Sequence, residues 1–260
     1  MERIIYDRMA EHDSSHWWYV ARREILAAVI QRHIIPYIRS PEPVEGRSSA
    51  NREERSLPKI LEIGCGTGHN LPMLQRFGTV DAIEIDAAAA AIATQRLGQP
   101  VSQSPLPALE GVPDAAYDLI ALLDVLEHVE DDAAALRAIA ARLKPGGHIL
   151  LTVPQYMWLW SGHDVANHHF RRYTKRTLRA VIAGAGLRIE RLTHFNSLLF
   201  PLAAADRMVA RLTGREGSDD ALPAGPLNAA FQAIFGIEKH LVGRVPMSPG
   251  VSLLAILRGG

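Results

Sequence analysis

Short apolar runs alternate with segments of helical period along most of this chain. An apolar run of about four to eight residues between turn residues is typical of a buried strand, and apolar residues three and four apart are typical of a helix packed on a sheet. Seven runs predict strands, at 60–63, 80–86, 101–107, 118–123, 148–153, 187–195 and 251–257. Helical segments lie between many of them, at 70–78, 87–97, 131–143 and 175–186. This alternation predicts an α/β fold with a doubly wound, mostly parallel sheet and right-handed crossovers.

Three further segments do not belong to this alternation. Near the N-terminus, Ile25, Leu26, Val29 and Ile30 form the apolar side of an amphipathic helix that begins around Tyr19. Between the last two predicted strands, two apolar stretches also have a helical character, at 198–212 and 227–242. Residues 40–58 are rich in Ser, Pro, Glu and Arg without any period, which favours a flexible surface insertion.

Composition narrows the functional classes. The length of 260 residues suits one decorated α/β domain. A formal net charge of +0 gives no overall field that attracts nucleic acid or an anionic membrane. The single cysteine, Cys65, excludes an intramolecular disulfide, and the first residues lack a signal-peptide core, so a cytoplasmic location is expected. No apolar run reaches the length of a transmembrane helix.

A glycine-rich turn follows the first predicted strand. Glycines allow a tight turn and let the backbone approach a ligand closely. Here they stand at Gly64, Gly66 and Gly68, after an acidic residue, Glu62. A dinucleotide fingerprint, G-x-G-x-x-G, requires its third glycine where this chain has His69. The spacing therefore disfavours a nicotinamide-dependent oxidoreductase.

Residues 61–68, LEIGCGTG, resemble the first motif of the class I S-adenosylmethionine-dependent methyltransferases. The stretch DVLEHV at 124–129 matches another form common in that family, and HWWYVAR at 16–22 resembles the WWFxxR pattern of its bacterial type 11/23-like members. The resemblance implies a Rossmann-like, seven-stranded sheet that is mostly parallel with an antiparallel last strand, accompanied by an N-terminal helix and a C-terminal helical insertion. It also implies S-adenosyl-L-methionine as cofactor and methyl transfer as the reaction.

On this basis we divide the chain into five parts. We expect an N-terminal helical cover at 1–39, a flexible insertion at 40–58, a cofactor-binding α/β core at 59–195, a helical insertion on the acceptor or lid side at 196–249, and the last core strand at 250–260. For the N-terminal helix, simple core packing is the alternative to a cover. For the helical insertion, core packing and a surface for a lipid-like acceptor are both open.

The resemblance also assigns cofactor-binding residues. The turn contributes Glu62, Gly64, Gly66 and Gly68, and the arginine of the N-terminal pattern is Arg22, whose guanidinium suits the cofactor carboxylate. An acidic residue at the end of the second strand suits the ribose hydroxyls. Glu84 and Asp86 both lie there; the family form favours Glu84 and leaves Asp86 as a helix N-cap.

Two more positions complete the predicted cofactor set. Asp124 is placed to pair with the α-amino group of the cofactor. Ser102 stands where the family usually has an aspartate that meets the adenine, so this contact is expected to be weaker or to come from the backbone. His128 is either structural or functional. Cys65 is interpreted as a small filler rather than a nucleophile.

The acceptor side is expected to begin after Pro154. The loop 155–174 carries aromatic residues, histidines and the pair Arg171 and Arg172. It is either a solvated loop or a substrate wall; paired arginines favour an anionic acceptor, such as a sugar- or lipid-linked precursor. If the reaction needs a general base, the candidates are His163, His169 and Tyr173. The histidine spacing matches no ligand set, and methyl transfer from a sulfonium needs no metal, so none is expected.

The predicted function is therefore methyl transfer to a small-molecule or sugar/lipid-linked, anionic acceptor. No nucleic-acid partner and no peripheral membrane contact are expected. The alternative is a partner subunit that binds S-adenosylmethionine but is inactive, because a fold and its motifs do not establish turnover. An intact set of Glu62, Glu84 and Asp124 speaks against that alternative.

Overall fold

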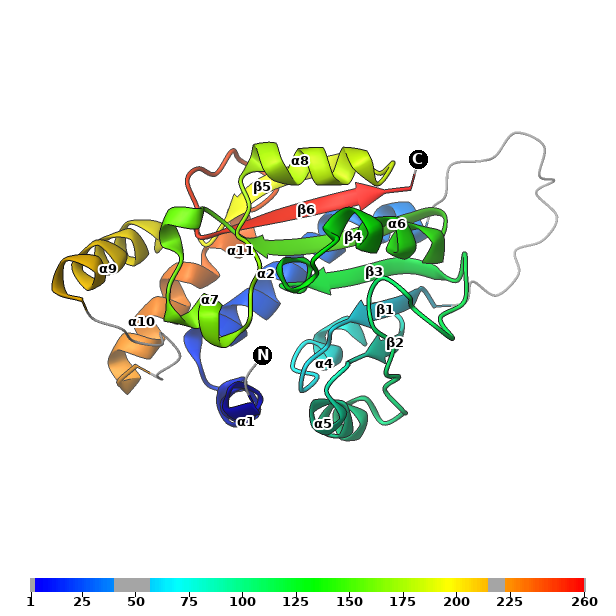
Figure 1. Cartoon of the computed structure of the whole chain (residues 1–260), viewed down its shortest axis with the longest axis horizontal. Coiled ribbons are helices and arrows are strands. Elements are labelled where there is room, and N and C mark those ends of the chain that lie inside the picture. Colours follow the sequence, from blue (N-terminus) through cyan, green and yellow to red (C-terminus); the bar gives the residue numbers. More distant parts are fainter. Residues whose placement is uncertain (1–2, 40–56, 215–222, 260) are drawn as a thin grey trace.

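The computed structural model describes residues 3–39, 57–214 and 223–259. Within these ranges one sheet of six strands forms the centre of the molecule, in the order β2-β1-β3-β4-β6-β5 (Figure 1). The strands are β1 (Lys59–Ile63), β2 (Thr79–Ile83), β3 (Tyr117–Leu123), β4 (Leu143–Pro154), β5 (Arg188–Phe195) and β6 (Ser252–Arg258). The first four are parallel, and β6 runs antiparallel to both β4 and β5. The α/β class and the antiparallel last strand are as predicted.

The prediction of a strand at 101–107, the third of the seven predicted, is wrong. Ser102 forms only an isolated parallel bridge with Ile83, in which the Ser102 N–H donates to the Ala82 carbonyl and the Ser102 carbonyl accepts from the Glu84 N–H. Proline stands at positions 100, 105 and 107, and a proline has no N–H to donate to a strand ladder. The edge of the sheet beyond β2 is therefore a loop.

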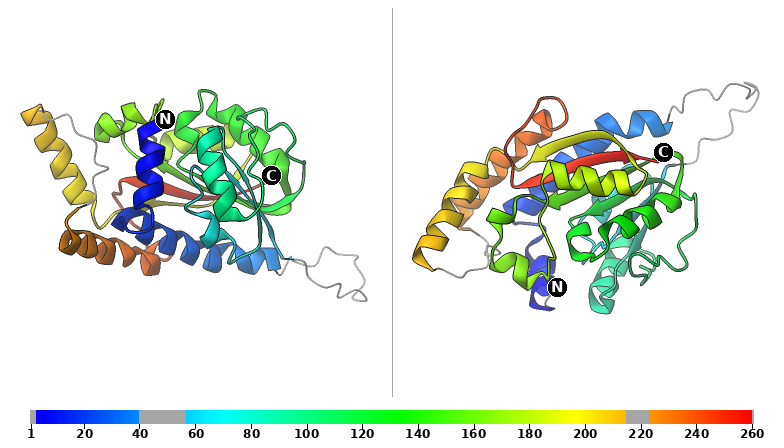
Figure 2. Two further views of the ribbon diagram at one scale, coloured as in Figure 1. Left: turned by 90° about the horizontal axis from the view of Figure 1, so that it is seen from below. Right: turned by 45° about the horizontal axis from the view of Figure 1, so that its top comes forward.

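Helices cover both faces of the sheet. Along the chain they are α1 (Arg3–His12), α2 (Trp17–His33), α3 (Ile35–Arg39), α4 (Leu71–Leu74), α5 (Ala87–Leu97), the short 3₁₀ helix η1 (Leu126–His128), α6 (Asp132–Arg142), η2 (Met157–Leu159), α7 (Gly162–Ala166), α8 (Lys175–Gly184), α9 (Phe200–Thr213), α10 (Gly225–Gly236) and α11 (Glu238–Leu241). Residues of α2, α4, α5 and α10 pack in one core cluster, and those of α6 and α8 pack in the other (Figure 2).

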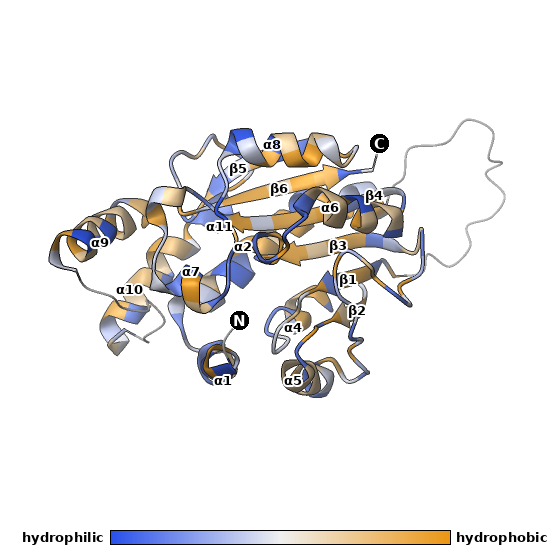
Figure 3. Cartoon of the chain, viewed as in Figure 1, coloured by the Kyte–Doolittle hydropathy of each residue, from blue (hydrophilic) through white to orange (hydrophobic). Residues whose placement is uncertain are grey.

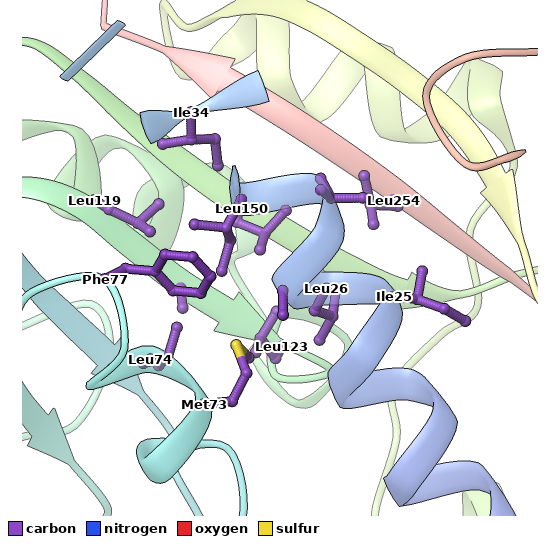
Figure 4. Close-up of a cluster of buried hydrophobic side chains, with 14 of the residues drawn as sticks. Ile25, Leu26, Ile34, Met73, Leu74, Phe77, Leu119, Leu123, Leu150 and Leu254 are labelled. Carbon is purple, nitrogen blue, oxygen red and sulfur yellow. The ribbon is translucent and has the colours of Figure 1, made fainter. Parts of the chain in front are cut away.

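Alternate strand residues supply the two cores. Ile60, Leu119 and Leu150 face the core beneath α2, while their neighbours Leu61 and Ile120 face the core beneath α6 and α8. The apolar colour of the strands in Figure 3 shows why the sheet must be covered on both faces. Figure 4 shows part of this packing, in which Ile25 and Leu26 of α2 and Ile34 just after it belong to one cluster with Leu150 and Leu254. The apolar side predicted for α2 is thus its core-facing side.

The N-terminal segment lies against the loop edge of the sheet as well as against the core. The sequence pattern did not predict α1. Arg3 of this helix lies 3.3 Å from Asp86, and Asp13, just after the helix, pairs with Arg96 of α5. The first tryptophan of α2, Trp17, packs its ring edge-on against Phe231 and Phe235 of α10. These contacts join the N-terminal segment to α5 and to α10.

Helices α9 to α11 lie between β5 and β6 in the chain. None of the residues of α9 is buried, and this helix extends away from the sheet (Figure 2). Within the described ranges no helix is long and apolar enough to cross a membrane. The predicted insertion at 40–58 lies outside the described residues, apart from Leu57 and Pro58.

Candidate functional site

A cavity of about 1110 Å³ lies at the carboxyl ends of β1, β2 and β3. This is the edge of a doubly wound sheet where ligands bind. On one side its wall comes from the glycine turn and the ends of β2 and β3, and on the other from the N-terminal helices and α9. Representative lining residues are Tyr6, Arg22, Gly66, Glu84, Asp124 and Leu202.

The glycine turn is fixed by the carboxylate of Glu84. One oxygen of this buried group accepts from the Gly66 N–H at 2.7 Å, and the other accepts from the Asp86 N–H at 2.9 Å and lies 3.3 Å from the Tyr6 hydroxyl. Gly64 and Gly66 have φ of 68° and 56°, a left-handed conformation that favours glycine. The sequence did not identify Tyr6 as part of the site, because nothing in its local pattern marks a contact so far along the chain.

Gly68 does not line the cavity but packs against helix α5. Its φ is 84°, and a Cβ at this position would lie 3.0 Å from the Ala93 Cα. A side chain here would push the turn away from the helix. Asp86, the alternative to Glu84, caps α5 by accepting from the N–H groups of Ala88 and Ala89. Of the two acidic residues, Glu84 is the one whose carboxylate contacts the glycine turn.

Glu62 lies behind the turn and is 1% exposed. Its Oε1 accepts from the Asn70 side chain at 2.8 Å, while its Oε2 has no partner among the described residues. Burial raises the pKa of Glu62 to about 7, against the opposing effects of Asn70 and Arg22. This residue supports the turn from the core rather than from the cavity wall.

Arg22 and Asp124 meet in the lining of the cavity. The guanidinium of Arg22 donates to the Asp124 carboxylate at 2.5 Å and to the Thr152 hydroxyl at 3.0 Å. Arg22 is 1% exposed, and its charge also lies 4.9 Å from the centre of the Trp18 ring. Asp124, at the end of β3, has a φ of 60°. The structure therefore brings together two of the predicted cofactor residues in a single ion pair.

At the position where adenine contact is expected, the structure differs from the family pattern. Ser102 is exposed and does not line the cavity. Two residues further on, Ser104 is 2% exposed, lines the cavity, and has a hydroxyl without a partner among the described residues. The sequence reasoning missed Ser104, because the loop around its prolines was interpreted as a strand.

On the acceptor side, Asp164 organises the loop. This carboxylate is 0% exposed, and its Oδ1 lies 2.9 Å from His169 Nδ1 and 2.7 Å from Arg172 Nε. Burial alone would raise the pKa of Asp164, but the hydrogen bonds with His169 and Arg172 outweigh it and hold the pKa below its usual range. Arg171 pairs at 2.9 Å with Asp132. Both arginines of the predicted pair thus have carboxylate partners within the chain.

The candidate bases separate into two groups. His163 and His169 line the cavity. Tyr173 is 2% exposed and is absent from the cavity wall; its hydroxyl lies 2.8 Å from Asp132. Burial raises the pKa of Tyr173 above its usual value. This residue fixes the loop to α6.

Beside His169 stand Glu127 and His128, from η1. The rings of His128 and His169 lie edge to face, with centroids 4.6 Å apart. Burial, followed by the proximity of His169, lowers the pKa of His128 to about 3. Glu127 is 0% exposed, neither of its carboxylate oxygens has a partner among the described residues, and burial raises its pKa.

Comparison with known proteins agrees with this geometry. Residues 8–192 match the family model described as a methyltransferase domain. The chain belongs to this methyltransferase family. It is similar to a ubiquinone biosynthesis O-methyltransferase of Acinetobacter baumannii (strain AYE), with 26% identity over 163 residues, 54% of this chain and 68% of the relative. A protein of the same name from Xanthomonas euvesicatoria pv. vesicatoria (strain 85-10) is 28% identical over 168 residues, 57% of this chain and 70% of the relative.

Solved structures show the same fold. A SAM-dependent methyltransferase from Archaeoglobus fulgidus superposes with a TM-score of 0.54 at 16% identity, covering 90% of this chain and 93% of that one. An S-adenosylmethionine-dependent methyltransferase from Mesorhizobium loti gives a TM-score of 0.51 at 19% identity, covering 86% and 96%. The methyltransferase is an enzyme that uses S-adenosyl-L-methionine, as the glycine motif predicts.

Proposed function

We propose that this methyltransferase methylates a hydroxyl group on a small, largely apolar molecule. The observation that carries the proposal is the size of the cavity. At about 1110 Å³ it exceeds the roughly 300–1,000 Å³ usual for a single ligand, so it has room for the methyl donor and for an acceptor beside it. The helices α1, α2, α9 and α10 contribute apolar side chains to it: Ile5, Met9, Trp17, Leu202 and Phe231.

The donor half of the cavity is the part around the glycine turn. Glu84 is positioned to accept from the ribose hydroxyls and Gly66 leaves the backbone open, since a Cβ there would meet only the Met9 sulfur, at 3.3 Å. Arg22 and Asp124 provide a cation and an anion for the carboxylate and the amino group of the methionine part. The Ser104 hydroxyl is the side-chain group that we assign to the adenine.

The donor, when bound, supplies a methyl group on a sulfonium. In the transfer, the acceptor oxygen forms a bond to the methyl carbon, the carbon–sulfur bond breaks, and its electron pair stays on sulfur. The hydroxyl proton passes to a polar side chain in the lining of the cavity, such as His169, or to solvent. The task of the chain is to hold oxygen and carbon in line, and positioning of this kind supplies much of the rate.

The names of the two relatives, ubiquinone biosynthesis O-methyltransferase, support an oxygen as the methylated atom of the acceptor. The anionic acceptor predicted from Arg171 and Arg172 lacks that support, since both guanidiniums contact carboxylates of the chain. A sugar- or lipid-linked molecule fits the proposal when its reactive part is apolar enough for this wall. The apolar lining favours a ring or a lipid-like tail.

A direct assay tests the proposal. The purified protein is incubated with S-adenosylmethionine and phenols or catechols with alkyl tails, and methylated product and S-adenosylhomocysteine are measured by mass spectrometry. We expect product from the tailed phenols or catechols. Binding of S-adenosylhomocysteine without turnover of any acceptor would favour the alternative of an inactive partner subunit. Methylation of charged glycans alone would favour the anionic acceptor predicted from the sequence.

A further inference from the structure

Three side chains that can bind a metal meet at the wall of the cavity. Glu127 and His128 come from η1, just after β3, and His169 comes from the loop after α7. One ligand atom from each lies within 4.8 Å of the others. Zinc–ligand bonds are about 2.0–2.2 Å long, so two atoms bound to one ion are at most about 4.4 Å apart. Small side-chain rotations would therefore bring these three atoms onto a common ion.

Glu127 has no other role that the structure explains. Its side chain is 0% exposed, and neither carboxylate oxygen has a partner among the described residues. A buried carboxylate without a partner is costly, and buried charges in proteins are paired or coordinate metals. The two nearby arginines are engaged elsewhere, because Arg22 binds Asp124 and Arg172 binds Asp164.

The two histidines are already oriented by second partners. Asp164 lies 2.9 Å from Nδ1 of His169, which leaves Nε2 as the nitrogen for a ligand. The ring of His128 forms a hydrogen bond with the backbone of Asn167. A carboxylate or a backbone carbonyl on the far nitrogen is the usual arrangement around a metal-bound histidine, where it fixes the ring and its tautomer.

We propose that Glu127, His128 and His169 form a binding site for a divalent first-row transition metal such as Zn²⁺, Co²⁺, Mn²⁺ or Fe²⁺. Two imidazoles and one carboxylate suit these ions, whereas Mg²⁺ and Ca²⁺ prefer oxygen ligands throughout. Three protein ligands leave further coordination positions for water or a substrate atom, which is typical of a catalytic rather than a structural site. This departs from the expectation that the protein has no metal, which was based on the histidine spacing along one loop and on the fact that methyl transfer from a sulfonium needs no metal.

The catalytic use of such a site rests on the proposed function. All three residues line the cavity that we assign to the acceptor. A metal there would bind the acceptor hydroxyl and lower its pKa, so that the proton passes to solvent and the oxygen attacks as an alkoxide or phenolate. No separate general base is then required, and His169 acts as a ligand.

Metal binding is tested on the metal-depleted full-length protein without any turnover assay. Zn²⁺ is titrated by calorimetry, and Co²⁺ is titrated by its visible absorption, which reports coordination number. We expect one ion per chain, with affinity that falls as the pH is lowered and the histidines become protonated. Mg²⁺ is the comparison ion and is expected not to compete.

Variants separate this site from adventitious binding. Glu127→Gln and His169→Asn should each weaken Zn²⁺ binding by about tenfold or more, while His168→Asn, on the same loop but outside the cluster, should leave it unchanged. Circular dichroism checks that each variant folds, and Zn²⁺ should raise the unfolding temperature of the wild type and of His168→Asn more than that of Glu127→Gln or His169→Asn. Equal binding by wild type and Glu127→Gln, or no binding of either ion to folded wild type, would overturn the proposal. Because the readout is binding, failure of the proposed O-methylation leaves this result interpretable.

Discussion

The guanidinium of Arg22 and the carboxylate of Asp124 lie 2.5 Å apart, although 102 positions separate the two residues in the sequence. Arg22 belongs to α2, and Asp124 directly follows β3 in a left-handed conformation with a φ of 60°. Aspartate tolerates this conformation better than most residues. The ion pair therefore connects the N-terminal helix to the ligand edge of the sheet.

Replacing Arg22 by alanine should destabilise the protein. Asp124 would lose a charged hydrogen-bond partner in a largely buried place, at a cost of about 1.5–3 kcal/mol in the free energy of unfolding. Urea unfolding of Arg22→Ala measures this. The control is Arg22→Lys, which keeps the charge but not the planar guanidinium. Its free energy of unfolding should lie between those of the wild type and Arg22→Ala. Unchanged stability of the alanine variant would show that the pair contributes nothing.

Glu84 and Asp86 should respond differently to substitution. Glu84→Ala removes the acceptor of the Gly66 N–H and the group assigned to the ribose, so S-adenosylhomocysteine should bind more weakly by about 1–3 kcal/mol. Asp86→Ala removes the cap of α5 and the exposed contact with Arg3, which together should cost about 0.5–2 kcal/mol of stability and leave affinity unchanged. Calorimetry and thermal unfolding of both variants make the comparison. Loss of affinity in Asp86→Ala alone would move the ribose contact to that residue.

The sequence predicted the parts of the fold that local pattern determines. The apolar runs at β1 and β3 and the glycines between β1 and α4 have strong local signals, so the sheet edge and its turn were located correctly. The strand at 101–107 failed because its prolines removed the backbone donors that pairing requires. Helix α1 was missed because its apolar side is short, with only Ile5 and Tyr6 buried.

Contacts between distant segments were beyond the sequence. The pairing of Arg172 with Asp164, the contact of Tyr6 with Glu84, and the meeting of Glu127 with His169 each join residues whose spacing carries no periodic signal. Burial is equally hidden, since Tyr173 has the chemistry of a base but a place in the core. Residue types at the ligand edge were predictable, and their partners were not.

The two arginines of the acceptor loop should also differ. Arg172→Ala leaves the fully buried Asp164 carboxylate without its main cation, and breaking a buried pair costs about 3–5 kcal/mol. In Arg171→Ala the partner Asp132 is nearer the surface, so the loss should be smaller, about 1 kcal/mol or less. Denaturant unfolding of both variants compares them. Equal losses would mean that Asp164 is not held by Arg172.

The N-terminal helices are predicted to close over the bound cofactor. Tyr6 contacts Glu84, and both Tyr6 and Arg22 line the cavity, so a ligand there would add contacts to α1 and α2. Hydrogen exchange over residues 6–30 should therefore slow when S-adenosylhomocysteine is added. Helix α8, on the other face of the sheet, is the internal reference and should exchange at the same rate. If the ligand changed the exchange rate of α1 no more than that of α8, the N-terminal segment would serve only in core packing.

The buried Glu62 should give the ligand-free protein a stability that depends on pH. Burial raises the pKa of Glu62 from 4.5 to about 7, so between these values the folded chain keeps a proton that the unfolded chain has lost. Since the folded state then binds more protons, the free energy of unfolding falls as the pH rises through this window. A shift of this size corresponds to about 3 kcal/mol at neutral pH and above, at about 1.4 kcal/mol per pKa unit.

Glu62→Gln isolates this effect, because the amide carbonyl can still accept from Asn70 and carries no charge. We expect the variant to lose less stability than the wild type between pH 5 and pH 8, when both are unfolded in urea without cofactor. Below pH 4.5 the neutral acid and the amide should be nearly equivalent, so the two unfolding curves should converge there. Parallel stability profiles across the whole range would show that Glu62 ionises in the folded protein at its ordinary pKa, and that Asn70 and Arg22 together compensate for its burial.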